Sequence, residues 1–143
     1  MYFQGHKVLV IGDTHDSPHL SQDRFEWIGK YIKDNSPDYV VHIGDCGSFD
    51  SLSFFQKNDT QQGKLKDAFM IDIESMRNAL SILNKYVGDI PHHFCMGNHE
   101  IRVHRFEERI PEIQGMMKKE LYDSFYKYGW TVSEYGEFKY VGG

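Results

Sequence analysis

Five side chains of the kinds that bind metal ions or transfer protons follow directly after three short apolar runs in this sequence. They are Asp13, His15, Asp45, Asn98 and His99. Each group comes directly after a glycine, and the types combine hard oxygen donors with imidazole nitrogens. Such a mixture suits Mn, Fe or Zn better than Ca or Mg. The spacing therefore indicates a divalent-metal site built from three separate segments.

The apolar runs are too short for helices and predict buried strands, at about 8–11, 39–43 and 91–96. Parallel strands that are buried on both faces end along one edge of the sheet, where α/β folds bind ligands. We therefore expect the five side chains to meet at that edge. The glycine behind each strand, Gly12, Gly44 or Gly97, should let the backbone turn sharply and approach an ion closely.

Helices are expected between the strands. Phe25, Ile28 and Ile32 recur at helical spacing after Ser21, and the helix should end near 35–37. A helix between two strands makes them parallel neighbours, which brings Asp13 toward Asp45. The polar residues of 46–63 predict a loop with one helical turn at 51–55, and the apolar spacing that follows predicts a long helix over 65–87 stopped by Gly88. The last part of the chain should hold amphipathic helices at 101–109 and 112–128 and further strands at 129–132 and 138–141.

The chemistry follows from these positions. Asp13 and His15 can turn toward one ion, and Asp45 has two oxygens, enough to bridge two ions about 3.5–4 Å apart, the spacing of two-metal phosphoesterases. Asn98 can offer its amide oxygen to the second ion. We expect His99, next in sequence and on a loop, to serve as an acid that protonates a leaving oxygen rather than as a ligand.

In order, these motifs resemble those of the calcineurin-like metallophosphoesterases: Asp13-Thr14-His15, Gly44-Asp45 and Gly97-Asn98-His99-Glu100. The resemblance runs from Lys7 to the end of the chain. It implies an α/β fold with a β-sandwich flanked by helices, two divalent metal ions, and hydrolysis of a phosphomonoester or phosphodiester by metal-activated water. It also implies that Asp45 is the bridging ligand and His99 the catalytic acid.

The chain departs from the family pattern in two places. Many members carry a second acid three residues after the Gly-Asp carboxylate, where it orients the catalytic histidine, whereas Ser48 stands here; Asp50 is a candidate substitute. The family also completes its metal shell with later histidines, which this chain lacks. We therefore expect residues 7–143 to form an incomplete domain, about the first two thirds, preceded at 1–6 by the remnant of an affinity tag.

The composition is ordinary for a soluble globular protein and does not indicate a substrate. A length of 143 residues is that of one domain, and a net charge of −5 suggests no broad basic surface for nucleic acid. No apolar run reaches the 18 or more residues of a membrane span, and no signal peptide opens the chain. Cys46 and Cys95 form no secreted disulfide framework, so a reduced, cytoplasmic setting is expected.

Other residues have competing interpretations. His42 is more easily explained as a core histidine than as a ligand, His92 and His93 as edge or surface residues, and His19 and His104 as either bystanders or substrate contacts. Arg102 and Arg105 are candidates for phosphate contacts or for a solvated helix face. For function, the substrate could be a nucleotide, nucleic acid or phosphoprotein. The alternatives are an inactive or partial metal-binding fragment, and a nucleotide binder, which the missing Gly-x-Gly-x-x-Gly disfavours.

Overall fold

The fold is mixed α/β, and the computed structural model describes residues 5–55 and 62–141. Its four strands form one parallel sheet in the order of the sequence: β1 (Val8–Ile11), β2 (Tyr39–His42), β3 (His92–Cys95) and β4 (Thr131–Ser133). The first three strands and the short strand near 129–132 are therefore confirmed. Residues 1–4 of the predicted tag remnant lie outside the described part of the chain.

Helices occupy every gap between strands, as the spacing predicted. They are α1 (Asp23–Asn35), α2 (Asp50–Phe55), α3 (Gln62–Val87), α4 (Asn98–Glu107) and α5 (Met116–Tyr126), with a 3-10 turn at Pro111–Ile113. The helical turn expected at 51–55 is α2, and α3 ends at Val87, directly before Gly88, which has a positive φ of 53°. Within the described residues, no helix is both long and apolar enough to cross a membrane.

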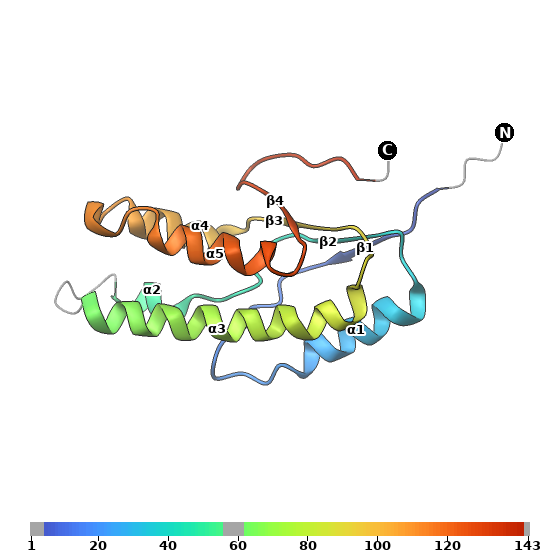
Figure 1. The fold of residues 1–143 in the computed structure, drawn as a ribbon, viewed down its shortest axis with the longest axis horizontal. Helices are drawn as coiled ribbons and strands as arrows, with labels where there is room; N and C mark the ends of the chain where they lie inside the picture. Colours follow the sequence, from blue (N-terminus) through green and yellow to red (C-terminus); the bar gives the residue numbers. More distant parts are fainter. Residues whose placement is uncertain (1–4, 56–61, 142–143) are drawn as a thin grey trace.

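The helices cover one face of the sheet and extend past its carboxyl edge. Figure 1 shows α1 and α3 side by side beneath the strands, with α2, α4 and the first half of α3 reaching beyond the strand ends. The apolar stripes meet the sheet in a continuous core, in which Phe94 of β3 stacks on Phe125 of α5 at 3.9 Å between ring centroids. This arrangement leaves the carboxyl edge enclosed by helices on one side.

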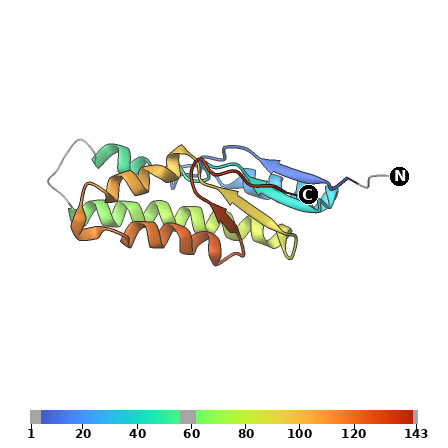
Figure 2. The same cartoon turned by 90° about the horizontal axis from the view of Figure 1, so that it is seen from above.

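Burial of the strands on both faces is wrong for β1. Leu9 and Ile11 point toward the helices, but Val8 and Val10 alternate with them on the opposite face and are 36% and 59% exposed. The reason is that the described helices pack on one face only. Figure 2 shows the chain after β4 running back along the sheet on the other side. The apolar content of β1 therefore indicated a strand but not how many of its faces are covered.

The strand predicted at 138–141 is also wrong. Residues 138–141 are irregular, and Phe138 and Tyr140 are 94% and 92% exposed. Alternating apolar residues form a strand only when a neighbouring strand accepts the backbone hydrogen bonds, and none of the described strands pairs with this segment. Because the described residues contain a single sheet, the second sheet of a sandwich stays a prediction.

The pairing between β1 and β2 continues into the loops that follow them. The amides of Thr14 and His15 both donate to the Asp45 carbonyl, at 3.2 and 2.9 Å. Further on, Asp16 N donates to Cys46 O at 2.7 Å and Ser48 N donates to Asp16 O at 2.8 Å. The two loops are therefore held together by backbone hydrogen bonds along their whole approach to the site.

Helix α4 begins earlier than the predicted start near 101. Its first residue is Asn98, so His99 lies in the first helical turn rather than on a loop, which corrects the prediction. The cause is Glu100, whose carboxylate reaches back to accept the Gly97 N–H at 3.0 Å, an arrangement that caps helix starts. A glycine followed three residues later by glutamate was the signal for this start.

Candidate metal centre

Three of the predicted side chains converge at the carboxyl edge of the sheet. His15 follows β1, Asp45 follows β2 and His99 opens α4, and one donor atom from each lies within 4.8 Å of the other two. The His15 and His99 rings meet edge to face, with centroids 4.6 Å apart. A carboxylate with two imidazoles is a donor set that suits Mn, Fe or Zn. The chemistry of this set thus fits the metal that the spacing predicted.

Asp45 and His15 occupy strained backbone positions. Their φ angles are 55° and 45°, in the left-handed region that few residues other than glycine adopt. Aspartate and histidine are among the better-tolerated exceptions, and such residues cluster at functional sites because the surrounding structure must enforce them. Here the enforcement comes from the backbone hydrogen bonds between the two loops. The strain falls on the residues that carry donor atoms.

Asp13 and Asn98 stand beside this cluster. The Asp13 carboxylate lies 3.5 Å from His15 Nε2, and its side chain is 56% exposed. The Asn98 amide nitrogen, when it faces Asp45, lies 2.7 Å from Asp45 Oδ2 and 3.3 Å from Oδ1. With the Asn98 nitrogen in that hydrogen bond, the Asn98 amide oxygen would point away from Asp45 and could accept from another group. All five predicted residues therefore gather at one edge, with Asp45 in contact with Asn98 and close to both histidines.

The His99 ring is oriented by a backbone carbonyl. Its Nδ1 lies 2.8 Å from Ser48 O, and its amide donates to Asp45 Oδ1 at 2.8 Å. Because a carbonyl only accepts, Nδ1 carries the hydrogen and Nε2 is the atom available for proton transfer or ligation. Asp50, the candidate substitute for the second acid, is exposed at the start of α2, and the group that contacts the His99 ring nitrogen is the Ser48 carbonyl.

Glu100 ties the loop after β2 to the start of α4. Its Oε2 accepts the amides of Asp45 and Gly97 at 2.8 and 3.0 Å, and its Oε1 accepts those of Cys46 and Gly47 at 2.8 and 3.4 Å. The side chain is fully buried, and burial raises its pKa to about 7, while the backbone N–H groups act in the opposite direction. Sequence reasoning gave Glu100 no role of its own.

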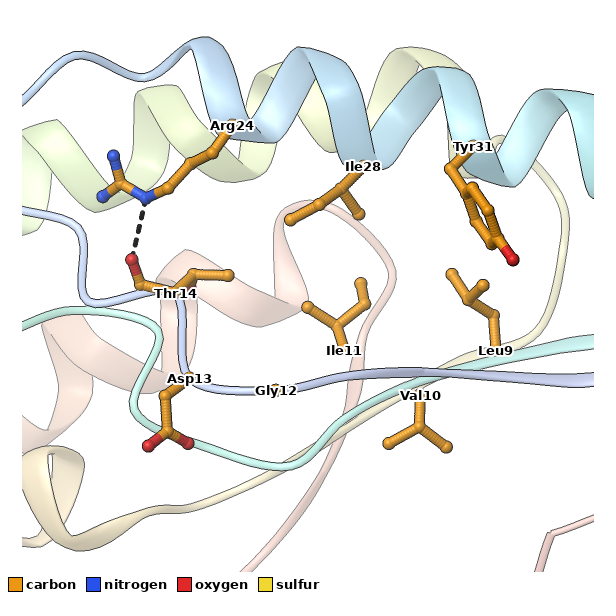
Figure 3. Close-up of a pocket in the computed structure, with 9 residues that line it drawn as sticks. All are labelled: Leu9, Val10, Ile11, Gly12, Asp13, Thr14, Arg24, Ile28 and Tyr31. Atoms are coloured by element: carbon orange, nitrogen blue, oxygen red, sulfur yellow. Dashed lines mark hydrogen bonds between the residues drawn. The ribbon is translucent and has the colours of Figure 1, made fainter.

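The Asp13–Asp16 loop is held by a second buried carboxylate that the sequence analysis did not single out. Asp16 accepts from Gln22 Nε2 at 3.0 Å and from Ser75 Oγ at 2.7 Å. Arg24 of α1 donates from Nε to Thr14 O at 2.8 Å (Figure 3). Its Nη2 also donates to His15 O at 3.1 Å. Nothing in the pattern of α1 distinguished Arg24 from a surface arginine.

Figure 3 also shows how β1 delivers its two kinds of side chain. Leu9, Ile11 and Thr14 point toward α1, where Arg24, Ile28 and Tyr31 complete the wall of a pocket. Asp13 and Val10 point to the other side of the strand. The change of direction at Gly12 and the following loop thus separates the acid from the apolar wall.

His42 is a core histidine, as the simpler interpretation held. Its Nδ1 accepts the Gly44 N–H at 3.2 Å, so Nε2 carries the hydrogen and donates to Thr14 Oγ1 at 3.1 Å. The Thr14 hydroxyl in turn donates a hydrogen bond to Cys46 O. Burial lowers the pKa of His42 from its ordinary 6.5 to about 3, and the Asp13 charge acts in the opposite direction. The imidazole is therefore a neutral link beneath the site.

This neutral histidine should make the protein sensitive to acid. The unfolded chain takes up a proton at His42 below its ordinary pKa of 6.5, but the folded protein does so only near 3. Stability is thus complete above 6.5 and is lost as the pH falls, by roughly 2 kcal/mol at pH 5. We expect His42→Gln to be less stable at neutral pH but to lose correspondingly less on acidification in urea unfolding. The control is His19→Gln, at an exposed histidine, which should lose as much unfolding free energy as the wild type when the pH is lowered. Equal losses in the wild type and both variants would show that His42 is not the source of the acid sensitivity.

Positions 44 and 97 have no room for a side chain, whereas position 12 does. Gly44 has a φ of 107°, and a Cβ there would lie 2.6 Å from Gly97 Cα. A Cβ on Gly97 would overlap the Asp45 carboxylate and lie 2.5 Å from the Asp45 nitrogen. Around Gly12 there is open space and no positive φ. The prediction of close approach therefore holds for two of the three glycines.

Alanine substitutions at these glycines should differ sharply. Gly97→Ala should destabilise the protein by about 1–3 kcal/mol, because the methyl group forces the Asp45 loop outward. Gly12→Ala should change stability by no more than about 0.5 kcal/mol. Urea unfolding of the two variants measures the difference. Similar losses in both would show that the Gly97–Asp45 contact does not govern the loop.

The remaining candidates lie away from the cluster. His19 and Arg105 are exposed, and His92 bonds to the carbonyls of Ile90 and Tyr128 at the opposite end of β3. His93 is buried, not a surface residue, because it bridges Thr131 and Ser133 of β4. His104 stacks on Tyr122 of α5, with ring centroids 5.9 Å apart. Burial also raises the pKa of the Cys46 thiol, which makes it a poor thiolate ligand.

Comparisons with known proteins identify the family of the chain. The chain is 28% identical over 130 residues to the gene 54 protein of Mycobacterium phage D29, a match that covers 88% of this chain and 50% of that protein. The chain thus spans about half the length of this relative. No solved structure is significantly similar to it. The family model for calcineurin-like phosphoesterases matches residues 6–142, and the chain therefore belongs to the calcineurin-like phosphoesterase family.

Proposed function

We propose that this chain carries the centre of a hydrolase that uses two divalent metal ions to cleave a phosphomonoester or phosphodiester. The observation that carries the proposal is the convergence of donor atoms of His15, Asp45 and His99 within 4.8 Å, with the Asp45 loop anchored to the start of α4 by the buried Glu100. Family membership supports metal-dependent phosphoester hydrolysis in general. The dinuclear form and the assignment of each residue are our proposal.

In this proposal Asp13 and His15 hold one ion, Asn98 holds the other, and Asp45 lies between them. Asp45 is suited to the shared position because its carboxylate contacts Asn98 and also lies close to His15. Bound Mn, Fe or Zn would supply the Lewis acidity that polarises the phosphoryl group and activates the attacking water. The protein contributes the placement of these donors on an enforced backbone.

We assign the proton transfer to His99. With Nδ1 held by the Ser48 carbonyl, Nε2 is the atom that would donate a proton to the leaving oxygen. The start of α4 fixes the main chain of His99, since its amide is bonded to Asp45. His99 is also near enough to the other donors to bind metal, so its role must be separated from theirs by experiment.

The test combines Mn²⁺ binding with hydrolysis of an aryl phosphate monoester and diester. We expect Mn²⁺-dependent turnover from the wild type, and from His99→Ala we expect retained Mn²⁺ but loss of most turnover. His104→Ala, on the same helix but outside the cluster, should behave like the wild type. Loss of Mn²⁺ in His99→Ala would instead make His99 a ligand. Binding without any turnover would favour the alternative of a partial metal-binding fragment.

A further inference from the structure

Arg24 holds the two peptide groups on either side of His15. Its Nε donates to Thr14 O at 2.8 Å (Figure 3), and its Nη2 donates to His15 O at 3.1 Å. The first carbonyl belongs to the peptide group before the His15 Cα and the second to the peptide group after it, and the φ and ψ angles of His15 set how the two groups are oriented. Because a guanidinium is planar and rigid, bonds to both carbonyls restrain the backbone of His15, which has a left-handed φ of 45°.

The position of Arg24 in the first turn of α1 is unfavourable for the helix itself. A cation at that end is repelled by the positive end of the helix dipole. Asp23 and Glu26, in the same turn, are acids, as the dipole favours. The dipole thus does not account for an arginine here, whereas its bonds to the loop after β1 do.

Asp16 compensates the charge of Arg24. Its buried carboxylate lies 3.7 Å from Arg24 Nη2 and also accepts from Gln22 and Ser75. The pair adds no net charge near His15. The guanidinium can therefore hold the two carbonyls without repelling a cation that His15 binds.

We propose that Arg24 is a positioning residue for the metal centre, which fixes His15 in the conformation that brings its imidazole close to Asp45 and His99. This inference rests on the proposed function and adds to it the residue that sets the geometry of one metal ligand. A lysine ammonium is a flexible point charge, and it would not hold the two carbonyls in a fixed relative orientation. The role thus depends on the shape of the guanidinium as well as on its charge.

The sign of the change in Mn²⁺ affinity separates positioning from charge. Removing a cation near the site would by itself raise the affinity for Mn²⁺, because Asp16 is left without its counter-charge. We instead expect Arg24→Gln to lower the Mn²⁺ affinity about tenfold or more, as is usual when a residue that orients a metal ligand is lost. Arg24→Lys, which keeps the charge, should fall between Arg24→Gln and the wild type. Lys30→Gln, at an exposed cation of the same helix, should stay within about twofold of the wild type.

A double-mutant comparison tests whether Arg24 acts through His15. Mn²⁺ affinity is measured by titration calorimetry for Arg24→Gln and Arg24→Lys, each alone and combined with His15→Ala, and circular dichroism confirms that the proteins are folded. In the His15→Ala background, both substitutions at Arg24 should lower the affinity by less than about twofold. The reason is that the ligand that they misplace is already gone.

Two outcomes would overturn the inference alone. Higher affinity in Arg24→Gln, with wild-type affinity in Arg24→Lys, would show that only charge matters. Equal losses with and without His15 would show that Arg24 supports the whole loop rather than this ligand. If Arg24→Gln does not fold, Arg24→Lys decides, because a wild-type affinity or a loss independent of His15 contradicts positioning there too. A wild type that binds no Mn²⁺ is distinguishable from these results, because it would reject the proposed function and this inference with it.

Discussion

Replacing Asp45 with asparagine should remove more bound metal than any other single change at the site. If Asp45 serves two ions, the substitution weakens both, so we expect Mn²⁺ affinity to fall by about 100-fold or more, beyond the 10–100-fold typical of supporting residues. The fold should survive. Asparagine has the same shape, its amide oxygen can still accept the His99 N–H, and the Asp45 main-chain bonds to Thr14, His15 and Glu100 do not involve the side chain.

The controls are Asp13→Asn and Asn98→Ala, each of which should affect one ion. Metal content after dialysis and calorimetric titration with Mn²⁺ give the comparison, and circular dichroism confirms that the variants are folded. If Asp13→Asn removes as much metal as Asp45→Asn, Asp45 is not shared between two ions. A single binding event in the wild type, abolished equally by His15→Ala and Asp45→Asn, would point to one ion at the His15–Asp45–His99 cluster.

Glu100→Gln should have the largest effect on stability. Each carboxylate oxygen accepts two backbone N–H groups, and an amide nitrogen can accept none, so either orientation of glutamine leaves two buried donors without a partner. Each orphaned buried donor costs about 1–3 kcal/mol. The loss is therefore roughly 2–6 kcal/mol, a large share of the 5–15 kcal/mol that stabilises a typical domain.

The same substitution at Glu108 separates this effect from a change of charge. Glu108 is exposed at the end of α4, and Glu108→Gln should alter stability by less than about 0.5 kcal/mol. Urea unfolding gives the free energy of unfolding of both variants. Mn²⁺ titration of the folded fraction of Glu100→Gln gives the metal affinity of the site. We expect Mn²⁺ affinity to fall with stability, because the loops that carry Asp45 and Asn98 lose their common anchor. A Glu100→Gln protein as stable as the wild type would show that the Glu100 carboxylate does not anchor these loops.

The strands and the gathering of the site were predictable because the sequence marks them in the same way three times. An apolar run, a glycine and a donor residue specify where a strand ends, and parallel pairing then brings the ends together. Helices α1 and α3 were equally clear from their 3.6-residue spacing. These local patterns do not show which faces of a strand are covered by helices. Nothing within Val8–Ile11 indicates that helices pack on one side of it only.

The interactions that support the site were harder to predict because backbone atoms make most of them. The Ser48 carbonyl orients His99 in place of an acid, and no residue type signals a carbonyl. Glu100 was recognisable as a helix-capping residue, but its bonds to Asp45, Cys46 and Gly47 depend on how two loops meet in space. Arg24 likewise bonds to carbonyls. The residues that perform chemistry thus appear in the sequence, while those that position them require the fold.

The backbone bonds that join the loops after β1 and β2 have a consequence for how the protein opens. Loops on a protein surface usually exchange their amide hydrogens with solvent through small local fluctuations, far more readily than the core. Here the amides of His15, Asp16 and Ser48 donate to backbone carbonyls across the two loops, beyond the end of the β1–β2 pairing. We therefore expect these amides to exchange more slowly than those of the exposed turn at Glu134–Glu137, at rates nearer to those of the strands. In that case the donor groups of the site open together with the sheet rather than before it.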